Sequence, residues 1–483
     1  MLYNASSLSL LSFSRTLALV YTRKNRSVFF APALNMKNIK HEGFLLNTSN
    51  TQHNQRRILS SGFTLAVTIG GIIGLGILRT PGEVAAVVSD RLTFVLLWLL
   101  GGLFILLSTV TAAELVGMTP RSGGTYVLMR RAYGPFPGFV IGWIDWLSFV
   151  ADTALKAVVV TEFTVLLIPA AVQWQTPLAI TVSSLFAALQ LRGITLGAKI
   201  QQIAAASLAI IVVGFTLALV FAGTAAGSNT AAVPNSGHGL GTWSLVVASI
   251  IYTYDGWIYA SYFSGEIKGG SGAVARACIK GVVVVILLYV FLTAALAWKV
   301  PLASLAGSEL ALASALEIVI SPLASTIVLV TAIIILLAHQ NLAYMTTPRI
   351  LQALAVDGLA VRRAAKISKG GNPIFAVLVS WGLSVVLIMI GGFKFLLHLS
   401  VFFYVFLYVL LIAGVIILRL RQPDADRPYR ARGHPWSTYT CLLGWIGLSL
   451  FQAINEFDTA VYAAILTAVS WPVYRVLMRS RPK

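Results

Sequence analysis

Long apolar segments recur along most of the chain, and this repetition constrains the fold more than any other feature. Twelve such segments are present, at 61–88, 92–118, 136–168, 177–191, 200–222, 243–264, 277–298, 322–346, 373–392, 395–418, 438–454 and 458–478. Most have the ~20 residues that an α-helix needs to cross a membrane, although the fourth is short unless its flanks extend it. Backbone polar groups in lipid must be satisfied within the segment, so we predict an all-α, polytopic membrane protein with 12 transmembrane helices.

The composition argues against several other classes of protein. Hydrophobic residues make up 58% and charged residues 11% of the chain, whereas a soluble protein carries roughly 25% charged residues. The two cysteines, Cys278 and Cys441, form no CxxC pair, so the sequence predicts neither a disulfide framework nor a metal site. No P-loop, HExxH or GxSxG sequence occurs, and we expect no cofactor, no ATP-driven step and no enzymatic activity.

Basic residues are distributed unevenly between the connections. The net charge is +19, and 30 of the 35 Lys and Arg residues lie in the N-terminal tail, the even-numbered connections and the C-terminal tail. The connections 169–176 and 224–242 contain no Lys, Arg, Asp or Glu. Because cytoplasmic loops are enriched in Lys and Arg, both termini are predicted to be cytoplasmic. This distribution also accounts for the positive charge without a nucleic-acid partner.

The chain is predicted to have three regions: a basic cytoplasmic tail at 1–57, a core of ten helices at 58–434, and a final helix pair with the C-terminus at 435–483. The first 41 residues contain no Asp or Glu. This composition is typical of a transit peptide, of a disordered tail, or of an extension (residues 1–35) upstream of a true start at Met36. We favour the last interpretation, because nothing after Met36 resembles organellar targeting.

The first apolar segment contains a cluster of helix-breaking residues. Four glycines fall within seven positions, at Gly70, Gly71, Gly74 and Gly76, and Pro81 follows. Each glycine weakens a helix by roughly 1 kcal/mol relative to alanine, and unwound backbone is tolerated in a membrane only where it lines a cavity. A break would expose N–H groups suited to a carboxylate and carbonyls suited to an ammonium group. Close helix packing through small residues is the alternative interpretation.

The sixth apolar segment supplies a second interruption. Asp255 and Gly256 lie in the middle of this segment, and a carboxylate at that depth costs several kcal/mol unless it faces the bundle interior or a cavity. Paired interruptions in corresponding segments are typical of transporters built from an inverted repeat. Asp255 is therefore predicted either to accept backbone hydrogen bonds at its own break or to take part in proton or substrate chemistry.

Four stretches together resemble the amino acid–polyamine–organocation superfamily. They are GGIIGLGILRTP (70–81), PRSGGTYVLMRRAYGPFPGFVIGW (120–143), YTYDGWIYASYFSGEIK (252–268) and PRILQALAVDG (348–358). The resemblance covers about residues 60–430 and implies the LeuT-type fold, a five-plus-five inverted repeat with discontinuous helices 1 and 6. It also implies transport of amino acids by alternating access.

The resemblance implies a substrate site at the two breaks. In the family, the substrate carboxylate meets backbone N–H groups of the first break, which here correspond to Gly74, Leu75 and Gly76. The amine meets carbonyls near Gly71 and Ile72 and on the sixth helix. On the sixth helix these carbonyls belong to Tyr252, which is at the position of an aromatic gate, and to Thr253. Asp255 and Trp257 flank the second break and complete the implied site.

One element of the family pattern is absent. Many relatives carry a lysine on the fifth helix whose ammonium takes the place of a sodium ion. The corresponding position here is Leu208, and Lys199 lies too early in the segment. The sequence is therefore compatible with three modes of transport: facilitated uptake, exchange with another amino acid, and coupling to a proton.

Charged residues inside the apolar segments are further candidates. Asp152 and Lys156 are four residues apart on the third segment, so they share a helix face and are predicted to form a structural ion pair. Substrate contact is the alternative role for this pair. Asp145 on the same segment and Glu83 in the first segment are, with Asp255, candidate gate or proton residues.

For two other polar residues, Glu114 and His339, the sequence predicts structural contacts. Glu114, at the end of the second segment, is expected to pair with Arg121 or Arg130 and to anchor the loop that follows. His339 stands alone in the eighth segment and is interpreted as an interhelical hydrogen-bond donor rather than a ligand.

These observations predict a secondary active transporter or exchanger of amino acids in the plasma membrane. Its partners would be the amino acid substrate, the lipid bilayer and a coupled proton or exchanged amino acid. A polyamine or organic-cation carrier of the same fold is the first alternative, because Asp145, Asp152 and Asp255 would suit a cation. A non-transporting receptor or a membrane-embedded enzyme is the second, and the lack of a large soluble domain or a catalytic motif argues against both.

Overall fold

The computed structural model describes residues 57–223, 239–390 and 393–479, and these residues are almost entirely helical. The longer helices are α1 (Ser61–Ile72), α2 (Gly76–Ala85), α3 (Arg91–Met118), α4 (Gly124–Tyr133), α5 (Pro135–Leu167), α6 (Gln175–Leu191), α7 (Ile194–Phe221), α8 (Leu240–Thr253), α9 (Gly270–Lys299), α11 (Ala311–Val319), α12 (Pro322–Val356), α13 (Ile374–Ile390), α14 (Phe393–Arg421), α15 (Trp436–Asn455) and α16 (Phe457–Arg479). The short ones are η1 (Pro169–Trp174), η2 (Tyr259–Phe263), α10 (Leu302–Leu305) and η3 (Arg362–Ala365). Except for its last position, the predicted tail at 1–57 lies outside the described residues.

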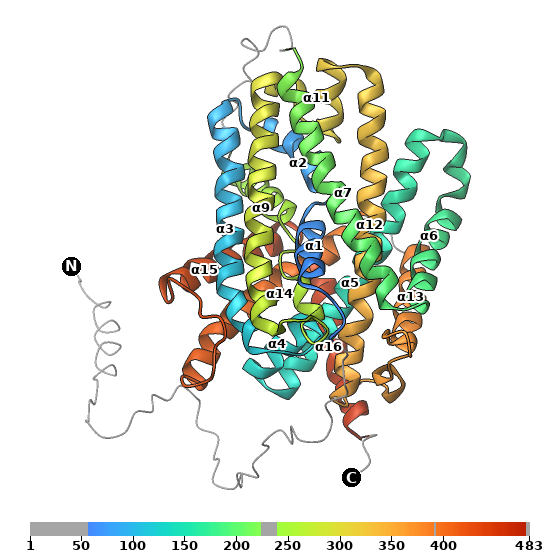
Figure 1. Ribbon diagram of the computed structural model, residues 1–483, viewed down its shortest axis with the longest axis vertical. Helices are drawn as coiled ribbons and strands as arrows, with labels where there is room; N and C mark the ends of the chain where they lie inside the picture. Colours follow the sequence, from blue (N-terminus) through green and yellow to red (C-terminus); the bar gives the residue numbers. More distant parts are fainter. Residues whose placement is uncertain (1–56, 224–238, 391–392, 480–483) are drawn as a thin grey trace, which may run out of the picture. The chain divides into compact units, whose positions relative to one another are not determined.

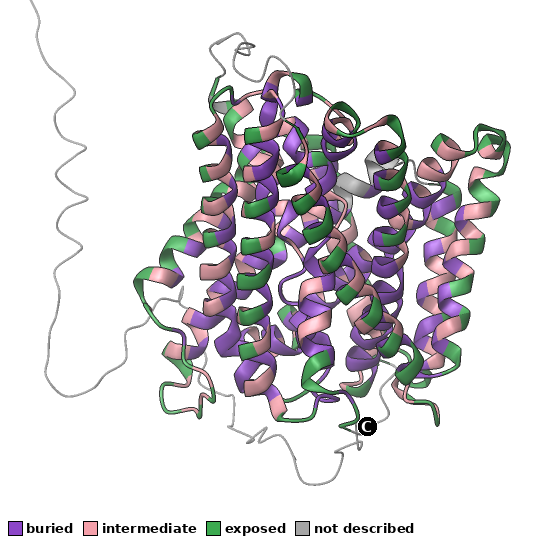
Figure 2. Cartoon of the chain, turned by 45° about the horizontal axis from the view of Figure 1, so that its top comes forward, coloured by how far each residue is buried: buried purple, intermediate pink, exposed green. Residues whose placement is uncertain are grey.

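The helices agree with the predicted all-α membrane fold. Eight helical segments in the described ranges are long and apolar enough to cross a membrane, with Ser61–Ala85 counted as one. Two shorter helices, 241–253 and 374–390, are apolar as well. Each of the 12 predicted segments contains a helix. Buried residues lie on the inward faces of the helices and exposed residues on the perimeter of the bundle (Figure 2).

Two of the predicted spans are discontinuous. The first is divided between α1 and α2, and in the sixth α8 ends at Thr253 and turns lead into the short helix η2. α1 packs against α7 and α9, while α2 packs against α8 and α11. Figure 1 shows α1 and α2 one above the other inside the bundle. Both interruptions therefore lie among other helices rather than on the perimeter.

The bundle has two ends that matter for the site. In Figure 1, α11 lies at the top and α4 at the bottom, and we call these the α11 end and the α4 end. α5 connects the two over 33 residues and packs against both α12 and α14. Because α5 is enclosed on these sides, it can carry the buried carboxylates Asp145 and Asp152.

The sequence did not predict every helical element. α4 and α11 lie in connections between the apolar segments, and with 10 and 9 residues they are too short to be recognised as membrane spans. α12 ends at Val356, beyond the predicted limit of 346. The extension includes Arg349, which is polar in sequence but is paired with Glu266 inside the protein.

Candidate functional site

The break in the first span lies against the sixth span. α1 ends at Ile72 and α2 begins at Gly76. A Cβ atom on Gly76 would lie 2.7 Å from Thr253 Oγ1, which is closer than real Cβ contacts allow. Thr253 Oγ1 is also 2.9 Å from Thr80 Oγ1, so α8 is joined to α2 at this point. The glycine is therefore needed for close approach of the two broken helices.

The carbonyl groups released at the end of α1 find side-chain partners on other helices. The Tyr289 hydroxyl of α9 donates to Ile72 O at 2.9 Å. His339 Nε2 of α12 lies 3.1 Å from Ile73 O, and because a carbonyl oxygen only accepts, Nε2 is the protonated nitrogen. These two contacts hold the non-helical backbone in place from two sides. His339 thus makes the kind of interhelical contact that its isolation in the sequence suggests.

The second break is built around Gly256. This residue has φ of 96°, which favours glycine, and a Cβ atom there would lie 2.3 Å from Gly71 O. The two breaks therefore touch through backbone atoms. The neighbouring Asp255 accepts a hydrogen bond from the Tyr408 hydroxyl of α14. This bond links the second break to the tenth span.

A cavity of about 420 Å³ lies where the two breaks face each other. Eight residues of the predicted substrate site line it: Gly71, Ile72, Gly74, Leu75, Gly76, Tyr252, Thr253 and Asp255. Other helices contribute Asp152, Lys156, His339, Tyr404 and Tyr408. The cavity thus brings together residues that are separated by up to several spans in the sequence.

The cavity extends toward the α11 end. Arg79 and Glu83 of α2 line it there and form an ion pair of 3.3 Å, with side chains 45% and 40% exposed. Asn455, the last residue of α15, and Glu456, which follows it, also contribute to its wall. Glu83 therefore lies at the rim of the cavity and not at its centre.

Two predicted residues do not line the cavity. Trp257 is 1% exposed, and its ring lies 5.0 Å from that of Tyr408, so it packs behind the second break. Asp145 is completely buried toward the α4 end, where it accepts hydrogen bonds from Thr125 and, at 2.9 Å, from the Tyr262 hydroxyl. Its partners are thus hydroxyl groups of α4 and η2.

Ion pairs connect the end of α12 to neighbouring elements at the α4 end, and the pair of Arg349 with Glu266 is buried. Arg349 of α12 is 2% exposed and donates through Nε and Nη2 to Glu266 at 2.8 and 3.1 Å. Asp357 pairs with Arg121 at 3.1 Å and with Arg130. Burial alone would raise the pKa of Asp357, but the two guanidinium groups outweigh it and hold that pKa below its usual value.

The third span places an ion pair directly on the cavity wall. Lys156 Nζ lies 2.5 Å from Asp152 Oδ2, and both residues line the cavity. Leu208, which the family resemblance places at the position of a lysine, is buried, whereas Lys199 is exposed. Among the described residues, Lys156 is the lysine that lines this cavity. Asp152 and Lys156, which the sequence predicts to pair, are in contact there.

The predicted partners of Glu114 were wrong. Glu114 pairs with Arg419 at 2.5 Å and with Arg427 at 3.0 Å, and it accepts the backbone N–H of Ala431. The connection after α14 therefore folds back onto α3, a long-range contact that sequence proximity does not reveal. Arg121 and Arg130 are instead directed to Asp357.

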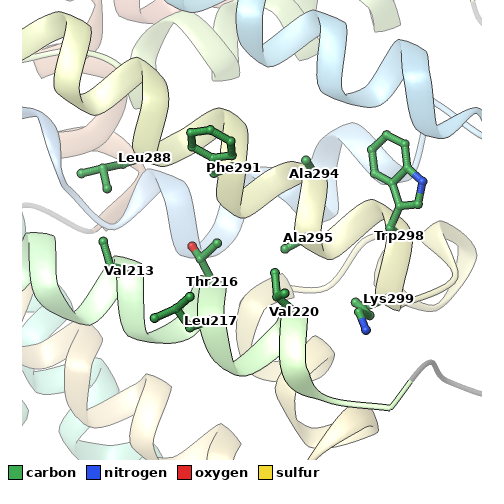
Figure 3. Close-up of a pocket in the computed structure, with 10 residues that line it drawn as sticks. All are labelled: Val213, Thr216, Leu217, Val220, Leu288, Phe291, Ala294, Ala295, Trp298 and Lys299. Atoms are coloured by element: carbon green, nitrogen blue, oxygen red, sulfur yellow. The ribbon is translucent and has the colours of Figure 1, made fainter.

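A second hollow, of about 490 Å³, lies between α7 and α9 (Figure 3). Its wall consists of Val213, Thr216, Leu217, Val220, Leu288, Phe291, Ala294, Ala295, Trp298 and Lys299. Its lining is nearly all apolar and includes exposed residues such as Phe291 and Trp298. It offers little to bind a polar substrate, so the cavity at the breaks is the candidate site.

Comparison with known proteins supports a transporter. Residues 63–476 match the amino acid permease family. The chain is similar to the serine/threonine exchanger SteT of Bacillus subtilis (strain 168), with 24% identity over 426 residues that cover 85% of this chain and 94% of that protein. It is also similar to b(0,+)-type amino acid transporter 1 of Homo sapiens, with 25% identity over 76% of this chain and 77% of the relative.

A third relative is the gamma-aminobutyric acid permease of Bacillus subtilis (strain 168), which is 23% identical over 90% of this chain and 96% of its own length. The family and these relatives are transporters and not enzymes, as the sequence predicts. Because the family match extends over most of the chain, from the first broken span to the last helix, this protein belongs to the amino acid permease family.

Proposed function

We propose that this protein is a secondary active transporter or exchanger that moves amino acids across the plasma membrane by alternating access. The observation that carries the proposal is the meeting of two helix breaks in one cavity. An amino acid has a carboxylate and an ammonium group attached to one carbon. A pair of adjacent breaks offers N–H groups and carbonyls at the same short spacing.

The first break suits the carboxylate. Gly74, Leu75 and Gly76 line the cavity at the start of α2, and Leu75 has no side-chain cap. The first N–H groups of a helix have no partner within it, and the helix dipole favours an anion there. These backbone groups are therefore the proposed carboxylate site.

The ammonium group would bind on the other side, at the carbonyls near Ile72, Tyr252 and Thr253. Ile72 O already accepts the Tyr289 hydroxyl, and a carbonyl oxygen has two lone pairs, so a second donor can be accepted. Tyr252 is half-buried at the cavity wall, in the position proposed for an aromatic gate. Gly71, the residue before Ile72, has no side chain and so allows its backbone to approach the backbone of Gly256.

Three carboxylates are proposed as gate or proton residues. Glu83 lies at the rim with Arg79, Asp255 at the second break with Tyr408, and Asp145 beneath the cavity with Thr125 and Tyr262. Asp255 is the proton candidate for a coupled cycle, because it alone of the three lies at a break. Asp145 and Glu83 would act as gates toward the α4 and α11 ends.

The positive-inside pattern supports an orientation with cytoplasmic termini and a cytoplasmic α4 end. In that orientation, the cavity extends toward the outside and the buried pair Arg349–Glu266 closes the inner side. This arrangement suits the outward-facing state of a transporter. Transport would then require opening of the α4 end, after the substrate has bound.

The named relatives favour amino acids over the other cargoes. These relatives are named for serine and threonine, for amino acids of the b(0,+) type, and for gamma-aminobutyric acid. A polyamine carrier remains the second candidate because Asp152 and Asp255 line the cavity. However, Lys156 already neutralises Asp152, which leaves little negative charge for a polycation.

Uptake and exchange in proteoliposomes test the proposal. Purified protein is reconstituted and given labelled L-amino acids, putrescine and spermidine, with and without unlabelled amino acid inside the vesicles. We expect uptake of at least one amino acid and faster uptake into preloaded vesicles if the protein is an exchanger. Uptake of polyamines without any amino acid would overturn the proposal in favour of the second candidate.

A further inference from the structure

A polar cluster on the cavity wall lies apart from the backbone groups of the two breaks. It consists of Asp152 and Lys156 on α5 and Tyr404 on α14, all of which line the cavity. Tyr404 is 4% exposed, and its hydroxyl has no hydrogen-bond partner in the part of the chain that the structure describes. A buried hydroxyl without a partner costs free energy, so this group is suited to a ligand that supplies the missing bond.

The cluster faces the two breaks. Asp152 and Lys156 line the same cavity as Asp255 of the second break and His339, which contacts the end of α1. A substrate whose carboxylate and ammonium occupy the breaks would therefore extend its side chain toward these residues.

The state of the ion pair limits which side chains fit. The side chains of Lys156 and Asp152 are 12% and 5% exposed, so both charges are largely removed from water. A cationic side chain would have to displace Lys156, and an anionic one would have to displace Asp152. Either event leaves a buried charge without its partner, which is strongly unfavourable.

An uncharged polar side chain meets neither obstacle. A hydroxyl or amide group can donate to the free lone pairs of Asp152 and accept from the Tyr404 hydroxyl or from Lys156, while the ion pair stays intact. A purely apolar side chain would leave the Tyr404 hydroxyl unpaired. The cluster therefore favours a neutral, hydrogen-bonding side chain over both charged and aliphatic ones.

We infer that Asp152, Lys156 and Tyr404 form the side-chain subsite and select amino acids with an uncharged hydroxyl or amide side chain. This inference rests on the proposed function, because it needs the amino acid backbone to bind at the breaks. It assigns a recognition role to an ion pair that the helical spacing alone would explain as structural.

Pairs of amino acids with nearly the same shape test the subsite. Binding to the purified protein is measured by thermal stabilisation for threonine and valine, serine and alanine, and asparagine and leucine. We expect threonine to bind about three- to tenfold more tightly than valine, as one net hydrogen bond provides. Lysine and glutamate should bind more weakly than either.

Tyr404→Phe removes only the hydroxyl group. The preference for threonine over valine should fall by about three- to tenfold in this variant, while valine affinity stays the same. Tyr439→Phe is the matched control, because Tyr439 is 47% exposed on α15 and does not line the cavity. An unchanged preference in Tyr404→Phe would overturn the role of the hydroxyl and with it the subsite.

Lys156→Met leaves Asp152 without its cation. Lysine or ornithine should then bind at least tenfold better than to the unaltered protein, since their side-chain ammonium replaces the lost one. If the unaltered protein binds amino acids but binds threonine and valine equally, the ion pair of Asp152 and Lys156 is structural. The inference then fails while the proposed function stands. If no amino acid binds or is transported, the proposed function fails and the inference fails with it.

Discussion

His339 Nε2 lies 3.1 Å from the carbonyl oxygen of Ile73, so the eighth span directly supports the point where α1 ends. Tyr289 supports the preceding carbonyl of Ile72 from α9. A break in a membrane helix leaves backbone groups that lipid cannot satisfy. In this protein, side chains from two other spans satisfy them, which fixes the backbone next to the candidate substrate site.

Replacing His339 should weaken the first break. In His339→Ala, the Ile73 carbonyl loses its donor, and an unsatisfied buried acceptor costs about 1–3 kcal/mol. We expect a lower apparent melting temperature in detergent and a lower affinity for substrate. His339→Gln provides an amide donor and should recover part of both. Equal stability and affinity in all three proteins would show that the contact has no energetic role.

The glycines of the first break should differ in their tolerance of a methyl group. A Cβ atom on Gly76 would lie 2.7 Å from Thr253 Oγ1, whereas one on Gly74 would have its nearest neighbour, His339 Cε1, at 3.4 Å. Gly76→Ala should therefore lower initial uptake rates at least tenfold, and Gly74→Ala should lower them less. Membrane insertion, measured by expression and monodispersity, should be unaffected in both. A fully active Gly76→Ala protein would contradict the close approach of the two breaks.

Breaking the ion pair at the α4 end should be costly. Arg349→Gln leaves Glu266 buried without its cation, and losses of about 3–5 kcal/mol are typical of such changes. We expect a large fall in thermal stability. The double variant Arg349→Met with Glu266→Leu removes both charges and should recover much of that stability. If the single and double variants are equally unstable, the arginine acts through packing and not through its charge.

Asp357 predicts a specific dependence of stability on pH. Its folded-state pKa is held below the unfolded value of roughly 3.9, so its stabilising effect is present at neutral pH and is lost as the pH falls through the folded-state pKa. Asp357→Asn should therefore melt at a lower temperature than the unaltered protein at pH 7. The difference between the two melting temperatures should narrow as the pH falls below the unfolded value and through the folded-state pKa. A constant difference between pH 7 and pH 3 would contradict this assignment.

Much of the architecture could be predicted because lipid imposes strong rules on sequence. Apolar length located the spans, the glycine cluster from Gly70 to Gly76 located the first break, and Asp255 with Gly256 located the second. The contacts across the bundle could not be predicted in the same way. Arg419 and Arg427 contact Glu114, which is some 300 positions earlier in the sequence. A hydropathy pattern locates helices but does not indicate which distant residues come into contact.

The candidate site was predictable in its backbone and less so in its side chains. Glycines that permit an unwound segment leave a visible pattern, as at Gly74 and Gly76. Tyr404 and Tyr408 lie in an apolar segment whose sequence predicts a membrane helix and gives no sign of a site. Their position at the cavity depends on how the helices pack. The position of Lys156 likewise depends on how α5 packs against α14.

The most direct test of the account asks whether the two breaks bind the charged groups of an amino acid. Thermal stabilisation of the purified protein is measured with an L-amino acid that it transports, with the matching amino alcohol, which lacks the carboxylate, and with the N-acetyl derivative, which lacks the ammonium. At a hundredfold excess over Kd, a ligand stabilises by about 2.7 kcal/mol. We expect this effect from the amino acid alone. Equal stabilisation by either derivative would contradict binding of both groups at the breaks.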